Sequence, residues 1–206
     1  MHIAEGVLSL PVLASCAALS AGGIALGVRR LDEARMPLAA LLGAAFMVAS
    51  TLHMPVGVGS VHLILNGLAG LLLGWAVFPL FFVALLLQAA LFSFGGFTVL
   101  GANLLIMAAP ALLCHVLLAP LLRGEPSRRR LLLVGAGCGL IGVGGAAVVA
   151  ALVLSLSGDR LFDHLIGGRA HDSVFSRDLL GHLLIQLVIC ELLRRPLGVP
   201  VQGGRP

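Results

Sequence analysis

Long apolar runs separated by short polar segments fill most of the chain, and this pattern restricts what it can fold into. Hydrophobic residues occupy 59% of the 206 positions and charged residues only 11%, against about 25% in ordinary soluble domains. A soluble globule of this size needs a charged surface that this composition cannot supply. The composition therefore excludes a cytosolic enzyme, a nucleic-acid-binding protein and a disordered chain. It predicts a single integral membrane domain over residues 1–206.

The apolar runs predict an all-α polytopic membrane protein with about seven transmembrane helices. A helix needs about 20 residues to cross the hydrocarbon core of a bilayer. The runs are continuous rather than alternating, which indicates helices rather than barrel strands. We expect a polar loop at about 157–177 and spans at about 7–28, 37–52, 61–78, 79–93, 99–122, 131–156 and 178–193.

The basic residues are distributed unevenly between the two sides that these spans define. All thirteen are arginine, and only Arg160, Arg169 and Arg177 fall on the side that carries the N-terminus. Because cytoplasmic loops are enriched in Lys and Arg, we expect the N-terminus outside and the C-terminus in the cytoplasm.

Most of the histidines fall on the side predicted to be outside. His2, His53, His62, His164 and His171 all lie in outer loops or at outer helix ends. Imidazole is the commonest protein ligand for divalent transition metals. This one-sided distribution predicts the capture of a metal cation from outside.

The first two residues can form a chelate by themselves. The amine of Met1, the amide nitrogen of His2 and the His2 ring Nδ1 follow one another along the chain, and they can close a five-membered and a six-membered ring around one ion. Binding requires the amide to lose its proton. Three coplanar nitrogens and a fourth imidazole make a square-planar site, which favours Ni(II) or Cu(II) over Zn(II) or Mg(II).

Three segments carry recognisable motifs. They are the opening Met1-His2-Ile3-Ala4-Glu5-Gly6, the run from Phe94 to Asn103, which contains a Gly-Gly-x-Thr-x-Leu-Gly-Ala-Asn pattern, and Gly59-Ser60-Val61-His62 followed by Gly67-Leu68. In these segments the sequence resembles the CbiM/NikM family, the substrate-capture (S) components of energy-coupling-factor (ECF) cobalt and nickel transporters.

The resemblance implies a metal site made from the Met1 amine, the His2 amide and ring, and the ring of His62. The Gly67-Leu68 spacing favours His62 over His53 as the fourth ligand. The segment from Gly95 to Asn103 would close over the ion. The bound Co2+ or Ni2+ is the transported substrate, and no cofactor is implied.

A further set of residues is expected to support this site or to line its entrance. Glu5 could neutralise the Met1 amine, orient His2 or attract the cation, and Asn103 could hold the N-terminal segment by hydrogen bonds. Asn66, one helical turn after His62, could orient its ring. The full set is Glu5, His53, Asn66, Gly95, Gly96, Thr98 and Asn103. Gln88 is expected to make an interhelical hydrogen bond.

The chain contains no nucleotide-binding motif, so we expect no enzymatic activity of its own, and ATP would be hydrolysed by partner subunits. The resemblance implies an ECF transmembrane coupling subunit, an ATP-binding cassette ATPase and a possible small companion membrane subunit, in a bacterial or archaeal cytoplasmic membrane. Small-xxx-small pairs predict packing within the domain or contact with the coupling subunit, at Ala40, Ala44, Ala45 and Ala49.

Two alternative functions have a basis in the residues. A haem-binding membrane subunit would use histidines inside spans, and His115 and His182 are the candidates. An intramembrane metalloenzyme would need His-Glu-x-x-His or a related spacing within a helix, and the chain has none.

Overall fold

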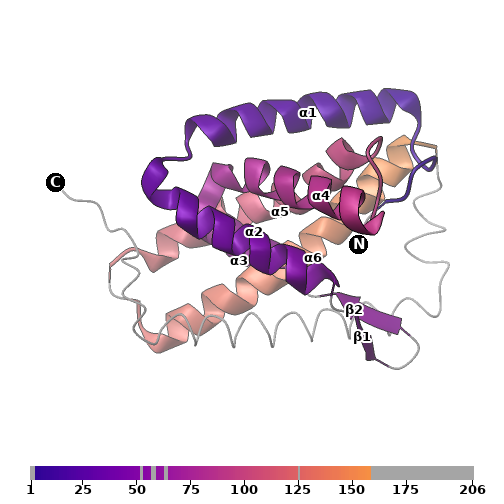
Figure 1. Cartoon of the computed structure of the whole chain (residues 1–206). Coiled ribbons are helices and arrows are strands. Elements are labelled where there is room, and N and C mark those ends of the chain that lie inside the picture. The colour runs from indigo at the N-terminus through magenta and orange to yellow at the C-terminus, as the bar shows by residue number, and fades with distance from the viewer. Residues whose placement is uncertain (1–2, 52, 57–58, 63–64, 125, 159–206) are drawn as a thin grey trace.

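The computed structural model describes residues 3–51, 53–56, 59–62, 65–124 and 126–158, with the backbone alone for 51–62. This part of the chain is a helical bundle with one short hairpin projecting from it (Figure 1). The predicted seventh span, most of the polar loop before it and the C-terminus lie outside the described residues. The elements in chain order are α1 (Leu10–Arg29), η1 (Glu33–Arg35), α2 (Met36–Thr51), β1 (His53–Val56), β2 (Gly59–His62), α3 (Asn66–Leu73), η2 (Gly74–Ala76), α4 (Val77–Phe92), α5 (Leu100–Leu118), η3 (Ala119–Leu122) and α6 (Arg128–Leu156).

Five stretches of the described chain are long and apolar enough to cross a membrane, when α3, η2 and α4 are counted as one stretch. Large apolar side chains remain on the outside of the bundle, and Leu10, Leu41 and Leu133 are each more than 60% exposed. An apolar exterior of this kind is suited to lipid rather than water, because hydrocarbon tails are as apolar as the side chains themselves.

The predicted third and fourth spans need a correction in their boundaries. The sequence predicted one helix over 61–78 and a second from Pro79, whereas the chain reverses at η2 and α4 already begins at Val77. Gly74 adopts φ +57° and ψ −126°, which ends α3. Pro79 then lies in the first turn of α4, where its missing N–H costs no helical hydrogen bond.

The beginning of the predicted third span is a strand rather than a helix. β1 and β2 pair antiparallel, with His53 opposite His62 and Val56 opposite Gly59. The helix that follows begins only at Asn66. The expectation that His62 and Asn66 share one helix face is therefore wrong.

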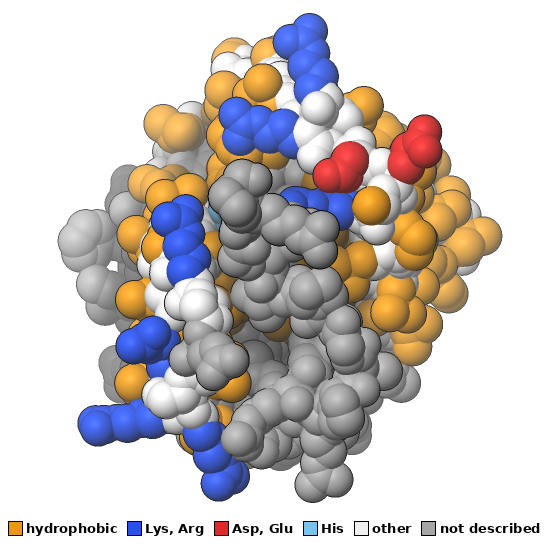
Figure 2. Space-filling model, turned by 90° about the vertical axis from the view of Figure 1, so that its left-hand side faces the viewer, with side chains coloured by type: hydrophobic (Ala, Val, Ile, Leu, Met, Phe, Trp, Pro, Cys, Tyr) orange, Lys and Arg blue, Asp and Glu red, His pale blue; other side chains and the backbone are white. Residues whose placement is uncertain are grey.

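Arginine side chains gather at one end of the bundle. Figure 2 shows them over the end where α1 finishes and α6 begins. Arg30 lies over the ring of Trp75, 5.2 Å from its centroid, which attaches the α1 terminus to η2. The N-terminal segment, the hairpin and the loop after α4 lie at the opposite end (Figure 1). We call this opposite end, which comprises residues 3–9, 53–62 and 93–103, the capture end.

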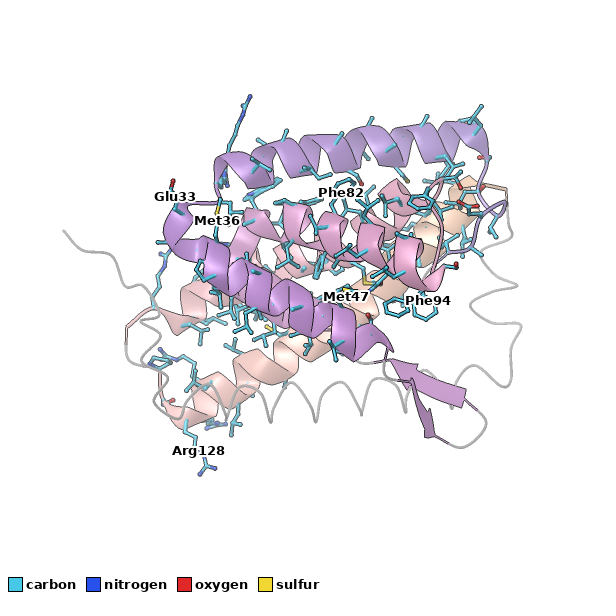
Figure 3. The ribbon with its side chains drawn as sticks, in the orientation of Figure 1. Glu33, Met36, Met47, Phe82, Phe94 and Arg128 are labelled. Carbon is cyan, nitrogen blue, oxygen red and sulfur yellow. The ribbon has the colours of Figure 1, made fainter. Side chains whose placement is uncertain are left out.

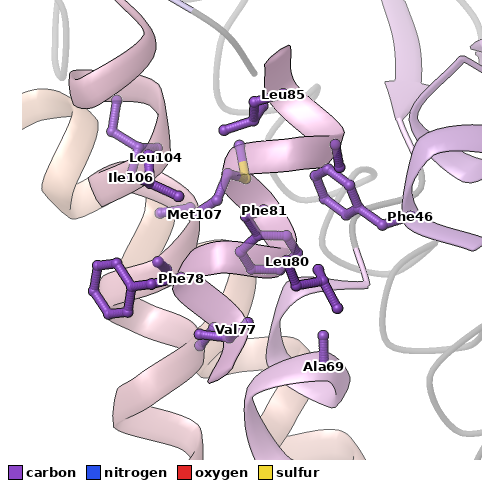
Figure 4. Packing of buried hydrophobic residues seen from close by; sticks show 14 of the residues in the cluster. Phe46, Ala69, Val77, Phe78, Leu80, Phe81, Leu85, Leu104, Ile106 and Met107 are labelled. Carbon is purple, nitrogen blue, oxygen red and sulfur yellow. The ribbon is translucent and has the colours of Figure 1, made fainter. Parts of the chain in front are cut away.

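The core lies where α2, α4 and α5 meet. Phe46 of α2 and Phe81 of α4 have ring centroids 4.7 Å apart. Figure 4 shows Met107 of α5 next to Phe81, with Leu104 farther from Phe46 on the same helix α5. All four side chains are at most 1% exposed. This cluster joins α2, which precedes the hairpin, to α4, which precedes the loop of residues 93–103.

Close backbone contacts hold the short helix α3 between α5 and α6. A Cβ atom added at Gly70 would overlap the carbonyl oxygen of Ala111, and one added at Gly67 would overlap the carbonyl oxygen of Cys138. Small residues permit such contacts between helices in membranes, where van der Waals packing is a main source of association. The position of α3, and of the hairpin before it, therefore depends on these glycines.

Substituting Gly70→Ala tests this packing. The added methyl group meets a backbone atom that cannot rotate away, so we expect a loss of about 1–3 kcal/mol of stability. The measurement is the thermal unfolding midpoint of the purified protein in detergent. The matched control is Gly22→Ala in α1, where an added Cβ meets nothing within 4 Å; it should gain about 0.5–1 kcal/mol. Equal midpoints for the two variants would contradict the packing described.

Candidate metal centre

The N-terminal segment is fixed to the start of α5 by a pair of hydrogen bonds. The Ile3 N–H donates to Asn103 Oδ1 at 2.8 Å, and Asn103 Nδ2 donates to the Ile3 carbonyl at 3.1 Å. Asn103 is 2% exposed and Ile3 is 9% exposed, so water does not compete for these bonds. Met1 and His2 lie outside the described residues.

A second attachment comes from Glu5. The Thr98 N–H donates to Glu5 Oε1 at 3.1 Å, and the Thr98 hydroxyl lies 3.2 Å from the same oxygen. The Thr98 backbone bond, followed by the Thr98 hydroxyl bond, lowers the pKa of Glu5 below its ordinary value of 4.5. Glu5 therefore binds the loop as a carboxylate.

The loop that receives Glu5 has a backbone that few residues can adopt. Gly95 and Gly96 have φ angles of +78° and +134°, a region that favours glycine. At Gly96 an added Cβ would also overlap the Glu5 side chain. These two glycines let the loop after α4 turn back over residues 3–5.

The start of α3 is held by Asn66, which is completely buried. Its Nδ2 donates to the Gly142 carbonyl of α6 at 3.0 Å, and its Oδ1 accepts from the Gly67 N–H at 2.8 Å. Each end of the amide therefore makes a hydrogen bond to the backbone of a helix. Its observed role is to anchor the segment that follows β2 against the middle of α6.

The alternatives for the fourth ligand, His53 and His62, lie directly opposite each other in the hairpin. Opposed residues of an antiparallel pair have Cα atoms about 4.5–5.5 Å apart. The sequence separates these histidines by nine positions, and the predicted spans placed His53 just after the second span and His62 at the start of the third. In the structure they form one pair at the base of the hairpin, between the end of α2 and the start of α3.

Gln88 of α4 contacts the loop of the capture end, although the candidate site residues did not include it. The expected interhelical bond is present: Gln88 Nε2 donates to the Ser50 hydroxyl of α2 at 2.6 Å. Its backbone carbonyl also accepts from the Phe94 N–H at 3.3 Å. Figure 3 shows Met47 of α2 and Phe94, which follows α4, at the same end of the bundle. The complete burial of Gln88 near the end of α4 is the signal that the sequence could not reveal.

Among the described residues, no group of three or more His, Cys, Asp or Glu side chains could hold a metal. Cys16, Cys114 and Cys138 are buried, and none of them forms a disulfide within the described part of the chain. His115, a candidate haem ligand, has Nδ1 at 3.1 Å from the Leu71 carbonyl and packs against Gly74.

The small residues of α2 divide into two faces. Ala49 is buried and Ala45 is half-buried, so this pair packs inside the bundle. Ala40 and Ala44 are exposed, next to the exposed Leu41. Only the Ala40/Ala44 pair is available to another helix.

Comparison with known proteins gives the chain its family. A family model described as "Cobalt uptake substrate-specific transmembrane region", CbiM, matches residues 2–191. A putative metal transport protein of Haemophilus influenzae is 56% identical over 166 residues, which is 81% of this chain and 81% of that protein. The fused nickel transport protein NikMN of Rhodobacter capsulatus is 37% identical over 164 residues, 74% of this chain and 46% of that protein.

The fold agrees with this assignment. A crystal structure of a truncated transition metal transporter matches with a TM-score of 0.67 and 24% identity, covering 94% of this chain and 96% of that one. The family model and the relatives confirm the resemblance inferred from the three sequence motifs. The long apolar helices of the chain and its family identify it as a multi-pass membrane protein. The chain belongs to the CbiM family, the substrate-specific transmembrane region of cobalt uptake.

Proposed function

We propose that the chain captures one Co2+ or Ni2+ ion as the substrate-binding membrane subunit of an ATP-driven ECF-type uptake system. The observation that carries this proposal is the two-bond attachment of Ile3 to Asn103. It holds the residue after His2 in one place at the capture end. A chelate made by a free N-terminus needs such an anchor, because an unrestrained terminus would lose conformational entropy on binding.

The proposed ligands are the Met1 amine, the His2 amide nitrogen, the His2 ring and the ring of His62. The amide gives up its proton as the ion binds, which favours metals that tolerate square-planar nitrogen ligation. Glu5 contributes a fixed negative charge at the same end, which raises the local concentration of cations. The loop of residues 93–99 covers the N-terminal segment.

The orientation follows from the charges at the two ends. The arginine-bearing end would face the cytoplasm and the capture end would face outward. The exposed Ala40/Ala44 pair supports contact between α2 and a coupling subunit. An ATPase that binds to the coupling subunit would supply the energy for uptake, and a small companion membrane subunit would complete the assembly.

Blocking the N-terminus should abolish metal capture. We expect a Gly-Ser-Gly-Ser extension before Met1 to remove high-affinity binding of Ni2+, because the Met1 amine becomes an amide. A single added residue is unsuitable, since it would place the histidine third and create a different chelate. Calorimetry and the visible spectrum of the nickel-loaded protein measure the effect.

The control is the same extension at the C-terminus, which should leave one square-planar Ni2+ per chain. Equal binding by the two extended proteins would place the site elsewhere and would contradict the proposed ligand set.

Removing the Asn103 anchor should weaken capture without unfolding the bundle. Asn103→Ala leaves the buried Ile3 N–H and carbonyl without partners, at a cost of about 1–3 kcal/mol for each group. We expect faster hydrogen exchange in a peptide covering residues 3–8, and weaker Ni2+ binding. Thr98→Val is the graded control, since it keeps both Asn103 bonds and the Thr98 N–H bond to Glu5. If hydrogen exchange in the peptide covering residues 3–8 is no faster in Asn103→Ala than in Thr98→Val, the two Asn103 bonds do not hold this segment.

The Glu5 attachment should depend on pH. Folding lowers the pKa of Glu5, so its contribution is complete above its ordinary value of 4.5 and is lost as the pH falls through the lowered value. A spin label at Val7→Cys, in a chain without other cysteines, should become more mobile across that pH range. Glu5→Gln should remove the step in mobility. If Glu5→Gln shows a change in mobility of the same size, the pH dependence belongs to another titratable group.

A further inference from the structure

A third contact holds the N-terminal segment, at the end that leads into α1. The Ser9 N–H donates to the hydroxyl oxygen of Ser157, a half-buried residue that directly follows α6. The two serines are 148 positions apart in the chain. Figure 1 shows the orange end of α6 beside the N-terminal segment. This bond therefore attaches the segment to a helix other than the one that Asn103 belongs to.

The backbone of Ser9 explains why its N–H seeks a partner outside α1. Ser9 is the N-cap of α1, with φ −67° and ψ 149°, and its carbonyl accepts from the Leu13 N–H at 3.0 Å. Its side chain makes no capping bond. An N-cap residue begins the helix with its carbonyl, and its own N–H has no partner within the helix. The Ser157 hydroxyl supplies that partner.

The N-terminal segment is thus fixed at both of its ends. Ile3 is bonded to Asn103 of α5, and Ser9 is bonded to Ser157 of α6. Between them the chain turns at Gly6, whose φ is +82°. A segment fixed at one end can pivot about that point, whereas a second fixed end removes many of its conformations.

The helix that carries Ser157 also holds the segment that follows the hairpin. The Gly142 carbonyl of α6 accepts from Asn66 Nδ2 at 3.0 Å, at the start of α3. One continuous helix, Arg128–Leu156, therefore lies between these two attachments. The position of the N-terminal segment relative to the chain after β2 depends on α6.

We propose that Ser157 is a positioning residue of the metal site, whose hydroxyl holds the α1 end of the N-terminal segment against α6. It acts through the backbone of residues 3–9 and not on the ion. A segment that is already fixed loses less conformational entropy when its ligands close around an ion, so the affinity is higher. The inference rests on the proposed function, since it assigns Ser157 to the same capture site.

The test compares Ser157→Val with Ser157→Thr. The two side chains have nearly the same shape, but only threonine keeps the hydroxyl that accepts from Ser9. We expect Ser157→Val to weaken Ni2+ binding about 2–10-fold, the range that corresponds to one net hydrogen bond. Hydrogen exchange in a peptide covering residues 3–10 should become faster. Ser157→Thr should keep the affinity and the exchange of the parent protein. The visible bands of bound nickel should be the same in both variants, because the ligands do not change.

Ser155→Ala is the matched control on α6. The Ser155 hydroxyl donates to the Leu152 carbonyl at 2.8 Å, a bond that stays within the helix. Removing it should leave the Ni2+ affinity and the exchange of residues 3–10 as they are in the parent protein. Should neither β-branched variant yield a monodisperse protein, Ser157→Ala compared with Ser155→Ala makes the same prediction.

The outcomes separate this inference from the proposed function. If the parent protein binds Ni2+ and Ser157→Val binds it as tightly as Ser157→Thr, the Ser157 hydroxyl does not position the site. The inference is then overturned while the proposed function stands. If the parent protein binds neither Ni2+ nor Co2+, the proposed function fails and the inference fails with it.

Discussion

The pairing of Ile3 with Asn103 is the interaction on which the capture end depends. Two hydrogen bonds in a buried position join the third residue of the chain to the first turns of α5. Such bonds are strong where water is excluded, and costly to leave unmade. They fix Ile3 to the bundle, although segments near a chain terminus are usually poorly ordered unless they are held by such contacts. Glu5 adds a second attachment through Thr98, and Ser9 adds a third through Ser157.

The remaining contacts bring other segments to the same end. The buried core of Phe46, Phe81 and Met107 connects α2, α4 and α5. Asn66 and the glycines of α3 place the chain that follows β2 against α6. Gln88 then links the end of α2 to the loop after α4. The capture end is thus built from buried amide side chains, each of which joins two segments distant in sequence.

Most helices were predictable from the sequence, since apolar runs of about 20 residues have few alternatives in lipid. The hairpin was not, because Val61 continues an apolar run and strand pairing between His53 and His62 depends on a partner nine residues away. The sequence predicted the boundary between the third and fourth spans at Pro79, whereas the chain turns at Gly74. The error arose because a proline in the first turn of a helix resembles a helix boundary. Asn103 was identified through a family motif, whereas the bond between Ser9 and Ser157 joins residues 148 positions apart and emerges only in the structure.

The central claim is that an ion is bound by nitrogen atoms of the first two residues and a hairpin histidine. X-ray absorption spectroscopy at the nickel edge of the loaded, purified protein tests it most directly. The account predicts four nitrogen neighbours in a plane, with outer-shell scattering from two imidazole rings and no sulfur. Six oxygen or nitrogen neighbours in an octahedron, or a sulfur neighbour from cysteine or methionine, would contradict it.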